Sequence, residues 1–367
     1  MRSRRCTPGQ TSATRSLAAV ALVLALVLVA GCGHGRRAPG PPPRRAFYYW
    51  RTTFTLSPAE QRALADVGAA RLYLRLFDVE WRGELDGPAT MGPVTAPTPL
   101  AAQLPATVEV VPVVYLRNEL FTRAPAARVG EVARWTWQEV RGRAAVLGLA
   151  PHELQLDCDW TESTRDRFFA FLTELGTLAR ADGVELSATI RLHQIKYRER
   201  TGVPPVSRGM LMFYNMGTFS PDPEERAIFD AASARRYLQR LAGYPLPLDV
   251  ALPIWSWTIH LRDDQVVDLL QSTDPDELPA LDFVRAAGPD RYEVTRTAFL
   301  HGNLLRAGDV LKIEVTAPAD TLAAARMLAP RLAPVATPRT VALFDLSERN
   351  LRRHATDDLD LVFRSVY

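Results

Sequence analysis

The sequence predicts an α/β protein built as one (β/α)8 barrel of the TIM type, with a small β insertion between its seventh and eighth strands. Two observations lead to this prediction. Eight short apolar segments of strand-like composition recur along the chain, and most are followed by a helical segment, which is the pattern of parallel βα units. The segments lie within residues 46–367, a length that exceeds one average domain but fits one large barrel.

The first four βα units can be assigned in order. The first strand is "AFYYW" from Ala46, and a helix follows with Ser57 as N-cap, Pro58 in its first turn and Gly68 as its stop signal. The second strand covers 71–79 and leads into a long loop rich in Pro and Gly, 80–105. The third strand covers 108–116 and precedes a helix that ends near Leu147. The fourth lies in "LQLDCDWTES", 154–163, before a helix over about 163–181.

The second half is less regular. Strands are predicted at 185–192, 209–217, 248–255 and 340–346, with helices over about 223–242 and 320–332 and a final helix from Ser347. Residues from about 271 to 318 are too many for one connection. Within them, "RYEVTRTAFL" and "DVLKIEV" are typical of two strands joined by "HGNLLRAG", and this pattern predicts the β insertion.

The N-terminal residues are predicted to lie outside the barrel. A basic start, an apolar run over 17–28 and "VAGC", ending at Cys32, predict a signal peptide over 1–31. The Cys after Ala-Gly resembles the bacterial lipobox, which implies cleavage before Cys32 and its acylation. The alternative is an ordinary secretory signal that ends near a Cys. Lipidation would anchor the exported protein to a membrane of the bacterial cell envelope, in a leaflet that the sequence does not identify. Residues 32–45, rich in Pro and Arg, are predicted to be an extended tether.

Composition narrows the remaining function classes. Of the 3 cysteines, Cys6 leaves with the signal and Cys32 is predicted to carry lipid, so Cys158 has no intramolecular disulfide partner. The net charge is +3 and the arginines are scattered rather than gathered into a basic stripe, so no nucleic-acid partner is predicted. No nucleotide-binding motif is present, and no cofactor is predicted.

The alternation of side chains along each strand predicts a polar barrel lumen. In the fourth strand Leu154, Leu156 and Cys158 form an aliphatic face that we assign to the outside. In the second strand Arg71, Tyr73, Arg75 and Phe77 share the inner face. The lumen is therefore expected to hold Arg75, Gln155, Asp157, Asp159, Arg191 and His193. Because unpaired buried charges are costly, Arg75 and Arg191 should pair with Glu153, Asp157 or Asp159.

Polar groups at the carboxyl ends of barrel strands are typical of an active site, although a purely structural charge network is the alternative. Aromatic rings beside carboxylates and amides suit a carbohydrate, whose C–H faces stack on rings while its hydroxyls need fixed partners. The candidate substrate-binding residues are Trp50, Arg75, Trp160, Arg191, Tyr214, Asn215, Trp255 and Trp257.

Two short motifs resemble the chitinase-type glycoside hydrolases of family 18. That family carries Asp-x-x-Asp-x-Asp-x-Glu on its fourth strand, and "LQLDCDWT" places Asp157 and Asp159 on its last two Asp positions. "MFYN", 212–215, matches the family's Met-x-Tyr-Asn on the sixth strand, and "ALPIW" before Ser256 resembles its seventh strand. The proton-donating Glu of the family falls on Thr161, however, and its first Asp on Leu154. A Thr hydroxyl cannot protonate a glycosidic oxygen at neutral pH, so the resemblance implies the fold more strongly than the activity.

Longer phrases, "LDCDWTESTRDRFF", "SATIRLHQIKY" and "GVPPVSRGMLMFYNMG", are similar to an uncharacterised family of bacterial lipoproteins. This second resemblance spans most of the mature chain and implies no activity.

Three hypotheses follow. The leading one is a membrane-anchored lipoprotein whose glycosidase-like barrel binds a glycan, with no need for hydrolysis. The alternative is an active glycoside hydrolase in which Asp157 and Asp159 form the electrostatic pair and Glu162, His193 or Glu80 donates the proton. The third is a metal-dependent hydrolase with Asp157, Asp159 and His193 as ligands. No spaced His cluster supports a metal site, so none is predicted. His193 is equally explained as a strand-end residue bonded to a neighbouring carboxylate.

Overall fold

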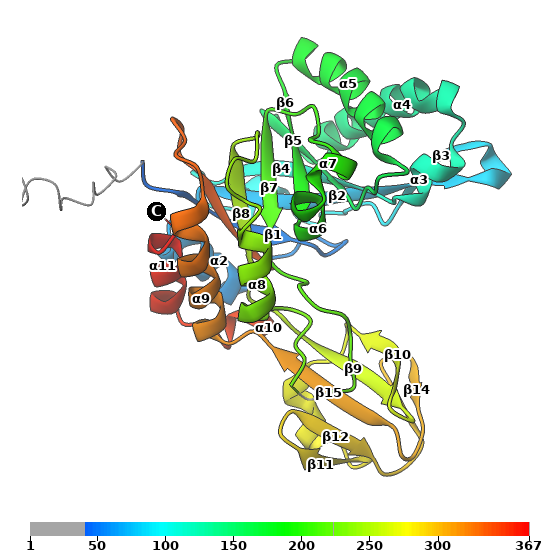
Figure 1. Cartoon of the computed structure of the whole chain (residues 1–367), viewed down its shortest axis with the longest axis vertical. Coiled ribbons are helices and arrows are strands. Elements are labelled where there is room, and N and C mark those ends of the chain that lie inside the picture. The colour runs from blue at the N-terminus through cyan, green and yellow to red at the C-terminus, as the bar shows by residue number, and fades with distance from the viewer. Residues whose placement is uncertain (1–40, 223, 367) are drawn as a thin grey trace, which may run out of the picture. The chain divides into compact units, whose positions relative to one another are not determined.

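The structure, a computed structural model, describes residues 41–222 and 224–366. Eight parallel strands within this range form a closed barrel, because β1 pairs with both β2 and β16. The barrel strands are β1 (Arg44–Tyr49), β2 (Arg71–Arg82), β4 (Glu109–Leu116), β5 (Glu153–Cys158), β6 (Glu185–Arg191), β7 (Arg208–Met212), β8 (Leu248–Pro253) and β16 (Thr340–Phe344). The predicted TIM-type barrel is confirmed (Figure 1). Its first strand includes Arg44 and Arg45, which were predicted to belong to the tether.

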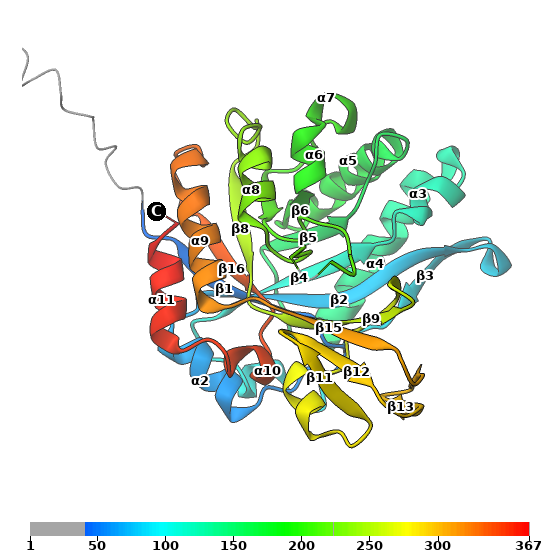
Figure 2. The same cartoon turned by 60° about the horizontal axis from the view of Figure 1, so that its bottom comes forward.

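Helices lie between the strands and cover the barrel (Figure 2). They are α2 (Pro58–Asp66), α3 (Glu119–Arg123), α4 (Val129–Val146), α5 (Arg165–Ala181), α6 (Leu192–Lys196), α7 (Arg198–Thr201), α8 (Ala231–Leu238), α9 (Pro318–Leu328), α10 (Glu348–Leu351) and α11 (Thr356–Arg364). The predicted start of the first helix is confirmed. The Ser57 hydroxyl accepts a hydrogen bond from the Glu60 backbone N–H, and the Glu60 carboxylate accepts one from the Ser57 backbone N–H.

Among the helices that the structure describes, none has the length and the apolar character of a membrane span. The predicted signal peptide and Cys32 lie outside the described residues.

The aliphatic faces of β5 and β6 pack outward, as predicted, and their polar faces point into the lumen. The Tyr48 hydroxyl donates to Gln155 across the barrel at 2.5 Å, and the Ser187 hydroxyl donates to Glu153 at 2.6 Å. Arg71 completes this network by pairing with Glu153 at 2.6 Å. The lumen core therefore contains a connected set of buried polar groups, and each charge in this set has a partner.

A β-bulge in β2 changes which of its side chains face the lumen. The register against β4 shifts between Arg75 and Phe77, which reverses the alternation beyond that point. Phe77, predicted to face inward, instead packs on the outside, with the Arg143 guanidinium of α4 5.3 Å from its ring centroid. Asp78 takes the inward position beside Arg75. The prediction for Phe77 was wrong because it assumed an unbroken period of two.

The insertion between β8 and β16 forms its own sheet. Five antiparallel strands, β9 (Ser256–Arg262), β10 (Gln265–Leu270), β11 (Val284–Gly288), β12 (Arg291–Val294) and β15 (Val310–Val315), pair in the order β10-β9-β15-β12-β11. A separate hairpin joins β13 (Ala298–Leu300) to β14 (Asn303–Leu305), so "RYEVTRTAFL" forms two strands rather than one. The sheet begins at Ser256, earlier than the expected boundary near 271. A further strand, β3 (Gly87–Met91), extends β2 as an antiparallel hairpin outside the barrel.

The loop after β7 differs most from expectation. A helix was predicted over about 223–242, but α8 begins only at Ala231, where the Asp230 side chain caps it. The preceding loop is held by strand β15 of the insertion. The buried Lys312 ammonium donates to the carbonyls of Ser220, Asp222 and Glu225 at 3.1, 2.6 and 2.7 Å. Tertiary contacts therefore override local helix preference in this loop.

Candidate functional site

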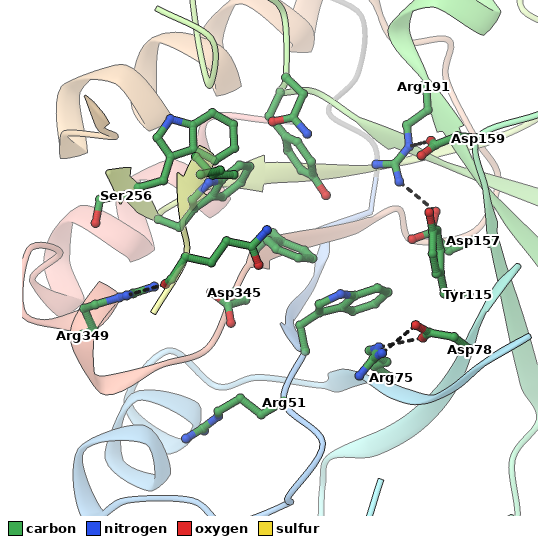
Figure 3. Close-up of a pocket in the computed structure, with 18 of the residues that line it drawn as sticks. Arg51, Arg75, Asp78, Tyr115, Asp157, Asp159, Arg191, Ser256, Asp345 and Arg349 are labelled. Carbon is green, nitrogen blue, oxygen red and sulfur yellow. Dashed lines mark hydrogen bonds and ion pairs between the residues drawn. The ribbon is translucent and has the colours of Figure 1, made fainter. Parts of the chain in front are cut away.

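A cavity of about 680 Å³ opens at the carboxyl end of the barrel strands. Its walls come from residues at the ends of most barrel strands and from the start of the insertion (Figure 3). This is the end of the fold at which barrel enzymes carry their active sites. Of the candidate site residues, the structure brings Asp157, Asp159, Trp50, Arg75, Arg191, Tyr214, Asn215, Trp255 and Trp257 together in it.

One wall is ionic and centres on Arg191, the last residue of β6. Asp157 is almost fully buried and accepts from the Thr189 hydroxyl at 2.6 Å and from Arg191 Nη2 at 3.0 Å. Arg191 Nε also pairs with Asp159, whose side chain is 47% exposed in the cavity. Burial raises the pKa of Asp157, and the guanidinium of Arg191 opposes that rise. Arg191 thus holds both aspartates of the fourth-strand motif, as predicted.

A second ion pair lies beside the first. Arg75 binds Asp78 through both Nε and Nη2, at 2.8 and 2.7 Å, and its guanidinium lies 5.9 Å from the ring centroid of Trp50. The expected partners of Arg75 were Glu153, Asp157 or Asp159, and that expectation was wrong. The bulge in β2 places Asp78 next to Arg75, whereas Glu153 lies deeper in the lumen and pairs with Arg71.

The facing wall is aromatic. Tyr214 lies edge-on to Trp255, with ring centroids 4.7 Å apart, and Trp255 contacts both Trp257 at 6.0 Å and Phe344 at 5.3 Å. Trp50 joins the group through Phe344 at 5.6 Å. Buried aromatic rings of this kind offer flat apolar faces while their polar tips take specific partners. The Trp257 indole N–H, for example, donates to Glu314 of β15 at 3.1 Å.

Several lining residues, among them two that were expected at this end of the barrel, were not chosen as candidate site residues. Tyr115, at the end of β4, lies beside Asp157, and burial together with Asp159 and Asp157 raises its pKa to about 12. Asp345 follows β16, and burial raises its pKa. Their positions after strand ends are visible in the sequence. Leu269 and Gln271 come from the insertion, whose placement over the barrel has no signal in the sequence.

Three predicted site residues lie elsewhere. Trp160 is fully buried beneath α5, where it stacks on Phe168 at 5.1 Å and its indole N–H donates to the Thr201 carbonyl at 2.9 Å. The alternation along β5 explains this, because Trp160 has the same parity as the outward residues Leu156 and Cys158.

Glu162 and His193 line a separate, smaller pocket of about 430 Å³ with Thr161 and Arg200. Glu162 pairs there with Arg200 at 2.5 Å. His193 was expected to be the next inward residue of its strand, but β6 ends at Arg191 and α6 begins at Leu192, so the strand period no longer applies. Burial lowers the pKa of His193. Neither residue can serve as a proton donor in the larger cavity from these positions.

The position of the family 18 acid also lies outside the cavity. The Thr161 hydroxyl is 3.0 Å from that of Ser163, and the Thr161 backbone N–H donates to Thr164 at 2.9 Å, so the residue belongs to the turn that starts α5. In the described part of the chain, no group of three or more His, Cys, Asp or Glu side chains is placed to hold a metal ion. The three proposed metal ligands are divided between the two pockets.

Comparisons with known proteins show which solved structures have a fold similar to this barrel. The sequence matches no model of a protein family, and no curated protein is significantly similar to it. Among solved structures, the spore cortex-lytic enzyme SleL of Bacillus megaterium QM B1551 matches with a TM-score of 0.55 at 12% identity, over 90% of this chain and 75% of that one. SleL of Bacillus cereus matches with a TM-score of 0.54 at 11% identity, over 90% and 76%.

A chitinase from Chromobacterium violaceum ATCC 12472 matches with a TM-score of 0.52 at 12% identity, over 88% of this chain and 98% of that one. At these identities the likeness concerns the fold. The chain has a (β/α)8 barrel similar to those of chitinases and SleL.

Proposed function

We propose that this protein binds a glycan in the cavity at the carboxyl end of its barrel and does not hydrolyse it by the family 18 route. The observation that carries the proposal is the division of one cavity into an aromatic wall and a wall of arginine–carboxylate pairs. Its volume, about 680 Å³, lies in the range of small-ligand sites.

The two walls match the two surfaces of a sugar ring. The apolar C–H face of a pyranose can stack on Trp50, Trp255 or Trp257, while its hydroxyls meet fixed donors and acceptors on the opposite side. The arginine–carboxylate pairs are preorganised for this task, because each holds its partner in place before a ligand arrives. The similarity in fold to chitinases and SleL supports a glycan as the ligand class.

The geometry gives no support to chitinase-type hydrolysis. The position that matches the family's acid is Thr161, and its hydroxyl lies in the turn before α5. The nearest replacement in sequence, Glu162, pairs with Arg200 in the second pocket. The two remaining carboxyl groups of the motif, Asp157 and Asp159, are both engaged in ion pairs with Arg191.

The anchoring part of the proposal depends on "VAGC" alone. An exported protein acylated at Cys32 would present its cavity to glycans at the surface of a membrane of the bacterial cell envelope.

The test is a screen of the full-length protein, purified in detergent, against cell-wall glycan fragments, N-acetylglucosamine oligomers and exopolysaccharides, with binding and cleavage scored separately. Trp257→Leu should abolish binding. Trp137→Leu is the matched control: Trp137 is as buried as Trp257, at 6% against 9% exposure, and its indole N–H also donates to a carboxylate, that of Asp182. Trp137 lies on α4, outside the cavity. Failure of every glycan to bind, or equal affinity in the two variants, would contradict the proposal.

A further inference from the structure

One carboxyl group of the cavity stands apart from the other three. Asp78 is paired with Arg75, and Asp157 and Asp159 with Arg191. Asp345 also lines the cavity but forms no ion pair with any residue in the described part of the chain. Three carboxylates therefore belong to preformed pairs, whereas Figure 3 draws no ion pair to the fourth, that of Asp345.

The surroundings of Asp345 fix its orientation. One carboxyl oxygen accepts from the Asn350 carboxamide at 2.6 Å, and the same amide donates to the Asp345 carbonyl at 3.0 Å. Asn350 is itself only 1% exposed, so this contact cannot move freely. The second carboxyl oxygen accepts no hydrogen bond from any other described residue, and Asp345 is one of the residues that line the cavity.

The charged groups nearest to Asp345 are already engaged. Arg51, which follows β1, pairs with Glu60 of α2 at 2.8 Å. Arg349 of α10 donates to the carbonyls of Gln271 and Thr273 at 3.2 and 3.4 Å. The remaining titratable neighbours are Tyr49 of β1, whose hydroxyl donates to the Thr53 carbonyl, and Glu348, whose backbone N–H donates to Glu60. No described cation forms an ion pair with Asp345.

We propose that Asp345 is the carboxyl group that contacts the glycan, and that it does so as a neutral acid that donates a hydrogen bond from its free oxygen to a sugar oxygen. This rests on the proposed glycan function of the cavity. A bound sugar removes water from Asp345 without supplying a positive charge, so it favours the neutral form.

The direction in which glycan affinity changes with pH follows from the coupling between proton binding and glycan binding. Burial already raises the pKa of Asp345 above its ordinary value, with Arg349 and Arg51 opposing the rise. If the ligand raises that pKa further, binding takes up a proton. Affinity is then highest below the pKa of the free protein and falls by up to about tenfold per pH unit above it. The fall therefore begins above the ordinary pH range of an Asp carboxyl, because the pKa of Asp345 in the free protein already lies above that range.

The experiment measures the affinity of the full-length protein for an N-acetylglucosamine oligomer, by tryptophan fluorescence, from about pH 4 to neutral pH. Wild-type affinity should fall as pH rises. Asp345→Asn is permanently neutral and keeps a donor, so it should retain the acid-pH affinity of the wild type within a few-fold and lose the pH dependence.

Asp249→Asn is the matched control. Asp249 is also a buried carboxyl, 1% exposed, and its pKa is raised to about 6, first by burial. It lies outside the cavity and binds Arg208 at 2.8 Å and the Thr340 backbone N–H at 2.7 Å. This variant should bind the oligomer with the pH profile of the wild type.

Equal pH profiles for Asp345→Asn and the wild type would overturn the role of Asp345 while leaving glycan binding intact. Calorimetry of the wild type in buffers of different ionisation enthalpy gives a second readout that needs no variant: net proton uptake on binding is expected, and its absence at every pH would overturn the proposal. If the oligomer binds the wild type at no pH, the glycan function fails together with it.

Discussion

Replacing Asp157 with Ala should destabilise the fold far more than replacing Asp159 with Asn, although both aspartates pair with Arg191. The reason is burial. Asp157 is 3% exposed and takes hydrogen bonds from Thr189 and Arg191, whereas the Asp159 side chain is 47% exposed in the open cavity. The two variants therefore separate a structural charge from one that borders solvent.

The expected loss in the free energy of unfolding follows from the groups that each substitution leaves without a partner. Without Asp157, the guanidinium of Arg191 keeps only Asp159, and the buried Thr189 hydroxyl loses its acceptor. Removing one partner of a buried pair costs about 3–5 kcal/mol. Asp159→Asn removes a pair that water screens, which is worth about 0–1 kcal/mol, and the amide can still accept from Arg191.

Urea unfolding followed by circular dichroism gives the free energy of unfolding of each variant, and an unchanged slope with denaturant shows that the native fold is retained. Asp157→Asn is a useful third variant, because it keeps the volume and the acceptor of Thr189 and should fall between the other two. A cost below about 1 kcal/mol for Asp157→Ala, or a larger cost for Asp159→Asn, would refute the buried-network explanation of these contacts.

Three further predictions come from other parts of the chain. The wild-type protein should partition with membranes and take up a labelled fatty acid, and Cys32→Ala should abolish the label; a soluble, unlabelled wild type would remove the lipoprotein hypothesis. Because burial raises the pKa of Asp249 to about 6, its neutral form stabilises the fold below about pH 4, and that stability, about 3 kcal/mol, is lost as pH rises through 6. Asp249→Asn should remove this loss in unfolding measurements at several pH values, and an unchanged slope of stability with pH would contradict it. Glu162→Gln and His193→Gln should leave glycan affinity unchanged, because both residues line the second pocket, and loss of binding in either would place that pocket in the glycan site.

The sequence predicted the barrel well because its signal is local and repeated. Alternation along β5 placed Gln155, Asp157 and Asp159 on the inner face, and the same rule, applied one residue further, would have placed Trp160 outside. Repeated strand-then-helix units left little choice of topology.

The errors arose where a local period was broken by tertiary structure. Because of the bulge in β2, Asp78 rather than Phe77 lies beside Arg75 on the inner face, and no residue type in that strand indicates the bulge. The end of β6 at Arg191 moved His193 into a helix. The loop after β7 is determined by Lys312, 87 residues beyond its contact with Glu225, which no local pattern can reveal.

We propose above all that the cavity binds a glycan and does not cleave it by the family 18 route. The most direct test of this proposal incubates the wild type with an N-acetylglucosamine oligomer, follows binding by tryptophan fluorescence, and analyses the same samples by mass spectrometry for shorter products. We expect saturable binding with the oligomer intact. Hydrolysis that is lost in Asp159→Asn at an unchanged melting temperature, or no binding at all, would contradict it.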